Sequence, residues 1–317
     1  MSDWFTGKVA YVSTWLGFKF GCSVARAFPQ TLFCIGDWLA RIAFFLFRGY
    51  RKQSTENIRI ALGENLDGSV VDNIARRSLR NFFRACIEIG IAIKISDEEF
   101  RARVPIVGRQ NVDAALAKGN GVIILSAHLG NFFLVGSRLA IDGLPTYVLV
   151  NQPRDGRFAD LMDEYRLQVR QKTIHARPRR IALQELQEVL RRNQIVVLIA
   201  DEYRQQGSGI EVSLLGRAVI ARRGPATLAM RTGAVIVPAC MVRQPDDTLK
   251  LMIEPELELE RTVRGKIQIR DNTIRVTQWV ERTVRAYPDQ WNWMNLRWWK
   301  EQAEDSAGAS EPVRRAS

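Results

Sequence analysis

The stretch Gly121–Phe133, with the sequence GVIILSAHLGNFF, constrains the fold of this chain more than any other. Its apolar run follows a glycine and ends in a turn of small residues, a pattern typical of a buried strand that leads into a loop. His128, one of only two histidines in the chain, stands in that turn. Ligands of open α/β sheets bind beyond the carboxyl ends of the strands, so His128 has the position of a functional residue. A core histidine that hydrogen-bonds to the backbone would fit the same position.

Short apolar runs and helical patterns alternate along the chain after Pro105. Strands that alternate with helices in this way are typical of βαβ units, so the sequence predicts an α/β fold with a largely parallel sheet covered by helices on both faces. We expect the α/β domain to cover residues 51–300 and the polar tail, residues 301–317, to be disordered. The expected strands are residues 121–126, 146–150, 195–200, 212–215, 235–238 and 249–253, and the expected helices are residues 131–142, 158–172, 181–193, 224–233 and 272–286.

Residues 1–50 are apolar and aromatic with isolated charges, and they predict a membrane-associated helical segment. The stretch Thr31–Phe47 approaches the roughly 20 residues that span a bilayer, but it contains Asp37 and Arg41. These two residues are four apart and can pair on one helix face, opposite an apolar stripe. The pattern favours a helix that lies in the membrane interface over one that crosses the membrane. The alternative is an amphipathic helix that covers the protein's own core.

The net charge of +12 and the predicted pI near 10 imply a negatively charged neighbour. Nucleic acid, an anionic membrane surface and an acidic protein or substrate all meet that description. The arginines are dispersed, and no zinc-finger, helix-turn-helix or RNA-recognition pattern accompanies them, so we expect no nucleic-acid partner. The four cysteines are scattered without the spacing of a zinc site or a disulfide framework. The absence of a nucleophile elbow, a Walker A loop and a Gly-rich dinucleotide motif argues against hydrolases, nucleotidases and dehydrogenases.

The residues that remain for chemistry follow the ends of predicted strands. His128 follows one strand and the pair Asp201–Glu202 follows another. A neutral histidine within reach of a hydroxyl can act as general base for attack on an activated acyl group. Cationic side chains nearby can hold a phosphorylated acceptor or stabilise an oxyanion. The candidates for that role are Arg154, Arg157 and Arg217, although a solvated surface arginine is the simpler interpretation of each one taken alone.

Five blocks of the sequence, in order along residues 51–300, resemble those of one family. The first block contains Asn57, and the second, Ser126–Phe132, contains His128 and Asn131. The third ends at Asp201, the fourth runs from Leu215 to Ala234, and the last, Pro288–Trp298, contains a Pro-x-x-Trp-x-Trp pattern. Together they resemble the late acyltransferases of bacterial lipid A biosynthesis (the lauroyl/myristoyl type), within the lysophospholipid acyltransferase superfamily.

The resemblance implies a glycerolipid acyltransferase-like fold and a chemical role for His128. The histidine would deprotonate an acceptor hydroxyl or amine, which then attacks a fatty-acyl thioester. The implied donor is acyl carrier protein or acyl-CoA, and the implied acceptor is an anionic membrane lipid or glycolipid such as a lipid A precursor. Asn131 and the three arginines would contact substrate. No metal, nucleotide or bound cofactor is implied, and the expected location is the cytoplasmic face of a bacterial inner membrane, as a peripheral or singly anchored protein.

One position departs from the family pattern. The family motif is His-x-x-x-x-Asp/Glu, whereas Phe133 stands five residues after His128. Phenylalanine cannot accept a hydrogen bond from the imidazole or stabilise its charged form, and loss of the orienting acid from a comparable triad costs about 10⁴ in rate. Three hypotheses follow: Asp201 or Glu202 supplies the acid from a neighbouring strand, the histidine acts alone, or the protein binds lipid without catalysis.

Overall fold

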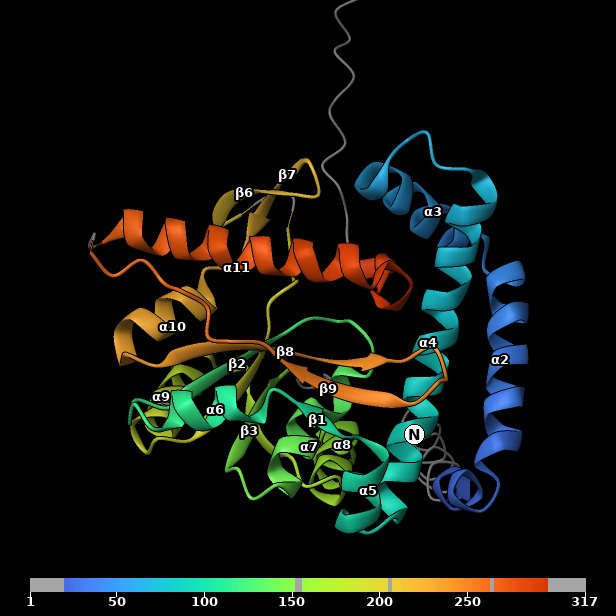
Figure 1. Cartoon of the computed structure of the whole chain (residues 1–317), viewed down its shortest axis with the longest axis horizontal. Helices are drawn as coiled ribbons and strands as arrows, with labels where there is room; N and C mark the ends of the chain where they lie inside the picture. Colours follow the sequence, from blue (N-terminus) through green and yellow to red (C-terminus); the bar gives the residue numbers. More distant parts are fainter. Residues whose placement is uncertain (1–19, 152–155, 205–206, 263–264, 296–317) are drawn as a thin grey trace, which may run out of the picture.

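The computed structural model describes residues 20–151, 156–204, 207–262 and 265–295, and its centre is a seven-stranded sheet (Figure 1). The strand order is β1-β9-β8-β2-β5-β3-β4. A separate antiparallel hairpin, β6-β7, lies above the sheet in Figure 1. The strands are β1 (Ile106–Val107), β2 (Val122–Ser126), β3 (Thr146–Val150), β4 (Lys172–His175), β5 (Ile195–Ile199), β6 (Ile210–Leu214), β7 (Arg217–Ala221), β8 (Val235–Arg243) and β9 (Leu249–Ile253).

Most neighbouring strands of the sheet are parallel, because helices connect them. The strands β8, β2, β5, β3 and β4 run in one direction, and β9 is antiparallel to β8. Each βαβ crossover returns the chain to the same edge of the sheet, so the carboxyl ends of the parallel strands meet there. The predicted α/β fold with a largely parallel sheet is therefore confirmed. The helices around the sheet are α5 (Asp97–Arg103), α6 (Arg109–Leu116), α7 (Val135–Ile141), α8 (Gly156–Gln168), α9 (Arg179–Arg191), α10 (Gly224–Thr232) and α11 (Lys266–Ala286).

The sheet is buried on both faces. Along β2 the side chains alternate between two apolar clusters, as the two-residue period of a strand requires. Ile123 and Leu125 belong to the cluster that includes residues of α9, α10 and α11, whereas Val122 and Ile124 belong to the cluster with α6 and α7. Strands covered on both faces are apolar throughout, which explains why runs such as Val122–Leu125 could be identified in the sequence.

Several elements differ from the sequence-based expectations, including β1 and β7, which are not among the expected strands. Strand β4 was not predicted, and the expected helix 158–172 ended at its first residue. Its sequence, KTIH, has one fully buried residue, because the strand lies at the edge of the sheet. Strand β8 continues five residues beyond the predicted end at Pro238, although proline usually ends a central strand. Helix α11 begins at Lys266, six residues before the predicted start. The predicted tail, residues 301–317, lies outside the described residues.

Three long helices lie at one side of the sheet in Figure 1. They are α2 (Pro29–Leu46), α3 (Arg48–Leu62) and α4 (Gly68–Lys94). The expected pairing of Asp37 with Arg41 is wrong. Asp37 instead accepts two hydrogen bonds of 2.7 Å from Arg84 on α4, and Arg80 lies 3.0 Å from the same carboxylate. Helix α2 therefore directs its acidic group toward the protein.

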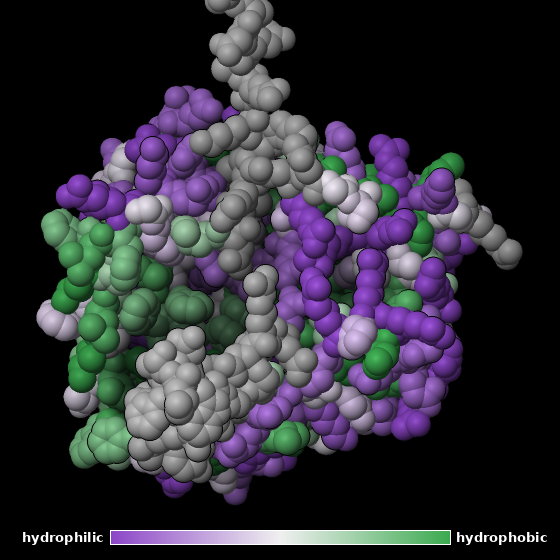
Figure 2. All heavy atoms as spheres, turned by 180° about the vertical axis from the view of Figure 1, so that it is seen from behind, coloured by the Kyte–Doolittle hydropathy of each residue, from purple (hydrophilic) through white to green (hydrophobic). Residues whose placement is uncertain are grey.

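The outer face of α2 is apolar. The side chains of Ile35, Trp38, Leu39, Phe45 and Leu46 are exposed, and Figure 2 shows hydrophobic atoms gathered on the side of the molecule where α2 lies. Among the described helices, none alone has the length and hydropathy of a membrane span; α2 and α3 together meet that test, but they are bent by 89° at their junction. Helix α2 thus pairs its acidic side chain with α4 and exposes several large apolar side chains together with Arg41. A soluble surface helix usually exposes polar side chains instead.

Candidate active site

His128 and Asp201 lie side by side because their strands are neighbours in register. Strands β2 and β5 are parallel, with Ser126 opposite Ile199, and each of the two residues follows its strand end by two positions. The amide of Ala200 donates to the carbonyl of Ser126 over 2.8 Å, which extends the pairing one step beyond the strands. The carboxyl edge of the sheet thus places an imidazole next to a carboxylate.

The Asp201 carboxylate is held by three N–H groups of the described residues. Its Oδ1 atom lies 2.9 Å from His128 Nδ1, and its Oδ2 atom accepts hydrogen bonds from the backbone N–H of His128 at 2.9 Å and from the indole Nε1–H of Trp291 at 2.7 Å. The Asp201 side chain is fully buried, whereas 20% of the His128 side chain is exposed. With Nδ1 bound to the carboxylate, the proton sits on Nδ1, so Nε2 is the ring nitrogen that can accept a proton from a ligand.

The pKa values of the two groups are shifted in opposite directions. Burial alone would lower the pKa of His128, but the hydrogen bond with Asp201 and the charges of Asp201 and Glu202 outweigh it and hold the pKa above its usual value. Burial alone would raise the pKa of Asp201, but the hydrogen bonds from His128 and Trp291 outweigh it and hold that pKa below its usual value. Asp201 is thus ionised at neutral pH, and it makes His128 a stronger base.

Glu202, the other candidate acid, is occupied elsewhere. Its carboxylate lies 2.7 Å from Arg222, and about one third of its side chain is exposed. Glu202 therefore acts on His128 through its charge alone, without a hydrogen bond to the ring.

Phe133, which stands at the position of the family acid, belongs to a cluster of aromatic rings. Its ring lies 4.0 Å from that of Phe132 and 6.4 Å from that of Phe82, measured between ring centroids. Phe132 in turn packs edge-on against the His128 ring at 4.8 Å. The space beside the imidazole where an acid would stand in the family motif is therefore apolar.

The loop after His128 is fixed by backbone hydrogen bonds to two other segments. The Gly130 N–H donates to the carbonyl of Gln290 and the Asn131 N–H to that of Met241, each over 2.9 Å. Gly130 has a φ of 58°, and a Cβ atom there would lie 2.0 Å from the carbonyl oxygen of Met241. Only glycine fits this position, because any side chain would displace β8 from the loop.

Asn131 is fully buried, and its side chain joins an ion pair in the interior. Its amide nitrogen donates to Glu88 over 2.8 Å, and Glu88 binds Arg243 through two contacts of 2.7 and 3.0 Å. The Arg243 guanidinium also donates to Asn81. This geometry favours a structural role for Asn131, which holds the loop in place, rather than the expected contact with substrate.

We expect Glu88→Gln to lower the free energy of unfolding by about 3 kcal/mol, because it leaves the buried charge of Arg243 without its counterion. The two side chains are only 10% and 5% exposed. The measurement is urea unfolding at neutral pH.

Asp72→Asn, on the same helix, is the matched control for that substitution. Asp72 pairs with Arg76 at 3.5 Å where both side chains are largely exposed, so its loss should change the free energy of unfolding by less than about 1 kcal/mol. Equal losses for the two variants would contradict the importance of the buried pair.

Of the three predicted cationic side chains, the structure describes only that of Arg217. Arg154 lies outside the described residues, and the same holds for the side chain of Arg157 in α8. Arg217 begins β7 and lies 3.7 Å from Glu64, on the hairpin rather than beside the histidine. Their contacts with substrate stay predictions.

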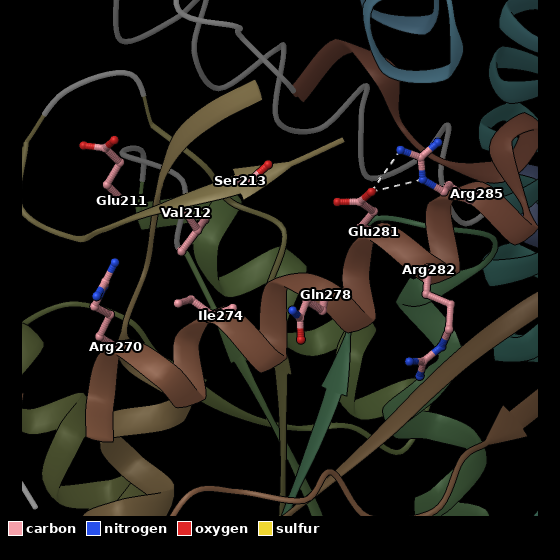
Figure 3. A pocket seen from close by; sticks show the side chains of 9 residues that line it. All are labelled: Glu211, Val212, Ser213, Arg270, Ile274, Gln278, Glu281, Arg282 and Arg285. Atoms are coloured by element: carbon pink, nitrogen blue, oxygen red, sulfur yellow. Dashed lines mark hydrogen bonds and ion pairs between the residues drawn. The ribbon is translucent and has the colours of Figure 1, made fainter. Parts of the chain in front are cut away.

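A cavity of about 710 Å³ lies away from these residues, in the groove between β6 and α11 (Figure 3). Glu281 bridges to Arg285 inside it, and Glu211 and Arg270 lie at its other end. Because its lining carries both signs of charge, the groove favours no one class of ionic ligand. Neither His128 nor Asp201 lines it.

No local sequence pattern predicts the contact of Trp291 with Asp201. Tryptophans in such a pattern can either pack in a core or anchor a membrane face, and the structure buries Trp291 and Trp293 almost completely. Core packing is thus the correct interpretation for these two tryptophans. The hydrogen bond to a carboxylate 90 residues earlier in the chain follows only from the fold.

Comparisons with known proteins match the chain to one family and to several relatives. A model of the family described as bacterial lipid A biosynthesis acyltransferase matches residues 3–300. The chain is 23% identical to a phosphatidylinositol mannoside acyltransferase of Mycolicibacterium smegmatis, over 89% of this chain and 90% of that protein. It is 27% identical to a phosphatidylinositol mannoside acyltransferase of Mycobacterium tuberculosis, over 75% and 71% of the two chains. It is 23% identical to a lipid A biosynthesis palmitoleoyltransferase of Escherichia coli, over 71% of each chain.

Proposed function

The chain belongs to the family of bacterial lipid A biosynthesis acyltransferases, and we propose that it uses His128 as general base to transfer a fatty acyl group from a thioester to a membrane glycolipid. Family membership makes the protein an acyltransferase that acts on a lipid or glycolipid acceptor. The observation that carries the catalytic proposal is the contact of His128 Nδ1 with the buried Asp201 carboxylate. We propose that Asp201 is the orienting acid and replaces the Asp or Glu that the family motif has at the position of Phe133.

The proposed reaction has two steps at one histidine. Nε2 of His128 takes the proton of the acceptor hydroxyl while the hydroxyl oxygen attacks the thioester carbonyl carbon. The resulting tetrahedral intermediate collapses, the carbon–sulfur bond breaks, and the imidazolium returns its proton to the leaving thiolate. Asp201 stabilises the imidazolium between the two steps, because its carboxylate is ionised and already bound to Nδ1.

The acceptor that we propose is a glycolipid with free hydroxyl groups and an anionic headgroup. The relatives act, by name, on phosphatidylinositol mannoside and on lipid A, which share a sugar headgroup on a membrane lipid. The net charge of +12 suits an anionic acceptor in an anionic membrane and an acidic acyl carrier protein as donor. Acyl-CoA, with its phosphate groups, is the second donor that this charge fits.

The test is acyl transfer by the purified full chain in vesicles that contain either a lipid A precursor or a phosphatidylinositol mannoside. Each acceptor is paired with labelled acyl carrier protein and with labelled acyl-CoA, and the His128→Ala protein is the blank. We expect one acceptor to be acylated by the wild-type protein only. If wild type and His128→Ala give the same products with every pair, the protein binds lipid without catalysis and the proposed function is wrong.

We further propose that the outer face of α2 docks on the cytoplasmic leaflet of the inner membrane. The exposed apolar side chains of α2 share their helix with the exposed Arg41, and Arg48 and Arg51 follow in the first turn of α3. Apolar side chains flanked by cations favour the boundary between acyl chains and anionic headgroups. This orientation brings the protein to the surface in which its acceptor lies.

We expect Leu46→Ser to weaken binding to anionic vesicles about tenfold, because burial of one leucine side chain contributes about 1.5–3 kcal/mol. Leu46 is 63% exposed on α2. The measurement is cosedimentation with vesicles of phosphatidylglycerol and phosphatidylethanolamine.

Leu167→Ser is the matched control for that experiment, since Leu167 is a leucine of similar exposure (66%) on α8. Equal binding of the two variants would show that vesicle binding does not depend on α2.

A further inference from the structure

We propose that Trp291 is a positioning residue of the active site, whose indole N–H holds the Asp201 carboxylate in the orientation that His128 requires. This inference rests on the proposed function, in which Asp201 acts through His128. It assigns a task to the C-terminal segment Pro288–Trp293, which lies outside the strands that carry the histidine and the acid.

The hydrogen bonds of Asp201 support this role. Each carboxylate oxygen has a distinct set of partners: Oδ1 faces His128 Nδ1, and Oδ2 accepts from the His128 backbone N–H and from Trp291 Nε1. The backbone donor and the indole donor together fix the plane of the carboxylate, and that plane aims Oδ1 at the imidazole. A fully buried carboxylate stays ionised only when such donors replace its lost hydration.

Trp291 is itself held in place by its surroundings. Its side chain is 1% exposed and packs edge-on against Trp293, with 4.8 Å between the ring centroids. Its carbonyl accepts a hydrogen bond of 2.5 Å from Ser78. An indole confined in this way loses little entropy when it binds Asp201, and it cannot follow the carboxylate into another orientation.

The same segment also binds the backbone of the histidine loop. Leu129 forms a β-bridge with Trp291, and the N–H of Asn292 donates to the carbonyl of His128 over 3.0 Å. Residues next to each other in the chain thus hold the histidine through its backbone and the acid through its side chain. This segment therefore contributes, together with the register of β2 and β5, to the separation between imidazole and carboxylate.

Other titratable groups that act on the pair do so through their charge or stay neutral, whereas Trp291 hydrogen-bonds to the carboxylate. Burial raises the pKa of the Cys240 thiol and of the Tyr203 hydroxyl, and the charge of Asp201 raises both further, so these two groups stay neutral. The charge of Glu254 also raises the pKa of Cys240. Glu202 adds negative charge near His128, but it is paired with Arg222.

The direction of the expected change follows from the charges. The indole N–H stabilises the Asp201 carboxylate most when the imidazole is neutral, because the negative charge is then uncompensated. Removal of the N–H therefore favours protonation of the imidazole, and the pKa of His128 should rise. Substitution of Asp201 itself should lower the pKa of His128, since it removes the negative charge that raises this pKa.

The experiment compares Trp291→Phe with Trp293→Phe. Both tryptophans are buried and both lose one indole hydrogen bond, but Trp293 donates to the carbonyl of Pro288 rather than to the carboxylate. The first readout is an NMR titration of ¹³C-labelled histidine, which is interpretable because the chain has only two histidines and His175→Gln identifies the second signal. The second readout is kcat and KM for acyl transfer over a range of pH.

For Trp291→Phe we expect the pKa of His128 to rise by about one unit and kcat to fall about tenfold with little change in KM, because hydrogen bonds to charged groups have energies of that order. For Trp293→Phe we expect neither change. An unchanged or lowered pKa of His128 in the Trp291 variant would overturn the proposal.

Two further measurements distinguish the proposed role of Trp291 from a general loss of folding and from a failure of the proposed function. Incorporation of β-(3-benzothienyl)alanine at position 291 keeps the size of the indole and removes only its N–H, so the same rise in pKa is expected without a cavity. The titration does not depend on turnover. A wild-type protein without acyl transfer would thus contradict the proposed function, while the His128 pKa would still decide the role of Trp291.

Discussion

Asp201→Asn is expected to lower kcat for acyl transfer by about 10⁴-fold, the size of the effect when the orienting acid of a comparable triad becomes an amide. The carboxylate accepts hydrogen bonds from the His128 backbone N–H and the Trp291 indole, so an amide side chain in its place keeps its oxygen on those donors and turns its NH₂ toward the ring. An NH₂ group there requires the proton of the imidazole to move from Nδ1 to Nε2, where it blocks the base. The measurement is kcat at saturating donor and acceptor.

The pH profile provides a second measure of the same substitution. Since the pKa of His128 lies above its usual value of about 6.5 in the wild-type protein, the activity should rise with pH through a point above that value. Asp201→Asn removes the charge that raises this pKa, so the rise should move to lower pH.

Glu202→Gln is the neighbouring control for Asp201→Asn. Glu202 is half-buried and paired with Arg222, and we expect a change in kcat of about twofold at most. If both substitutions left kcat within a factor of about ten of the wild type, neither carboxylate would be the orienting acid.

His128→Ala is expected to reduce acyl transfer by about 10⁴-fold or more, because it removes the only group of the pair that can reach a ligand proton. The double substitution of His128 and Asp201 should be no slower than His128→Ala alone, since the carboxylate acts through the ring and has no task without it. The measurement is single-turnover transfer with high enzyme concentrations, which detects slow residual rates.

His175→Ala is the control for the loss of a histidine. His175 lies 3.1 Å from Asp163, at the edge strand β4, and its removal should leave kcat within about twofold of the wild type, because distant and independent sites act separately. Fully additive losses in the double variant of His128 and Asp201 would contradict a functional unit of histidine and acid.

The sequence allowed the central strands to be predicted for a simple reason. Strands buried on both faces are continuously apolar, and polar residues that follow two such runs stand out. His128 and Asp201 each follow such a run by two residues, so a parallel sheet makes them candidates for one edge. That β2 and β5 are direct neighbours, rather than two strands apart, is a property of the strand order and could not be predicted from these runs.

Contacts between distant segments could not be inferred in the same way. The bond from Trp291 to Asp201 joins residues 90 positions apart, and the pair of Glu88 with Arg243 joins residues 155 positions apart. In sequence, a glutamate in a helix and an arginine at a strand end resemble surface residues, because nothing local indicates that each buries the other's charge. Strand β4 was missed for a related reason: an edge strand needs few buried side chains, so its sequence lacks an apolar run.

The dependence of the His128 loop on the segment around Trp291 has a consequence for biosynthesis. A ribosome makes the chain from its N-terminus, so α2 and the histidine leave the exit tunnel long before residues 288–293. The Gly130 amide and the carbonyl of His128 find their partners, Gln290 and Asn292, only when nearly all of the described chain has been translated. At about 5–20 residues per second, this delay is on the order of ten seconds. Under the proposed docking of α2, a nascent chain would rest on the membrane in a catalytically silent form until residues 288–293 complete the site.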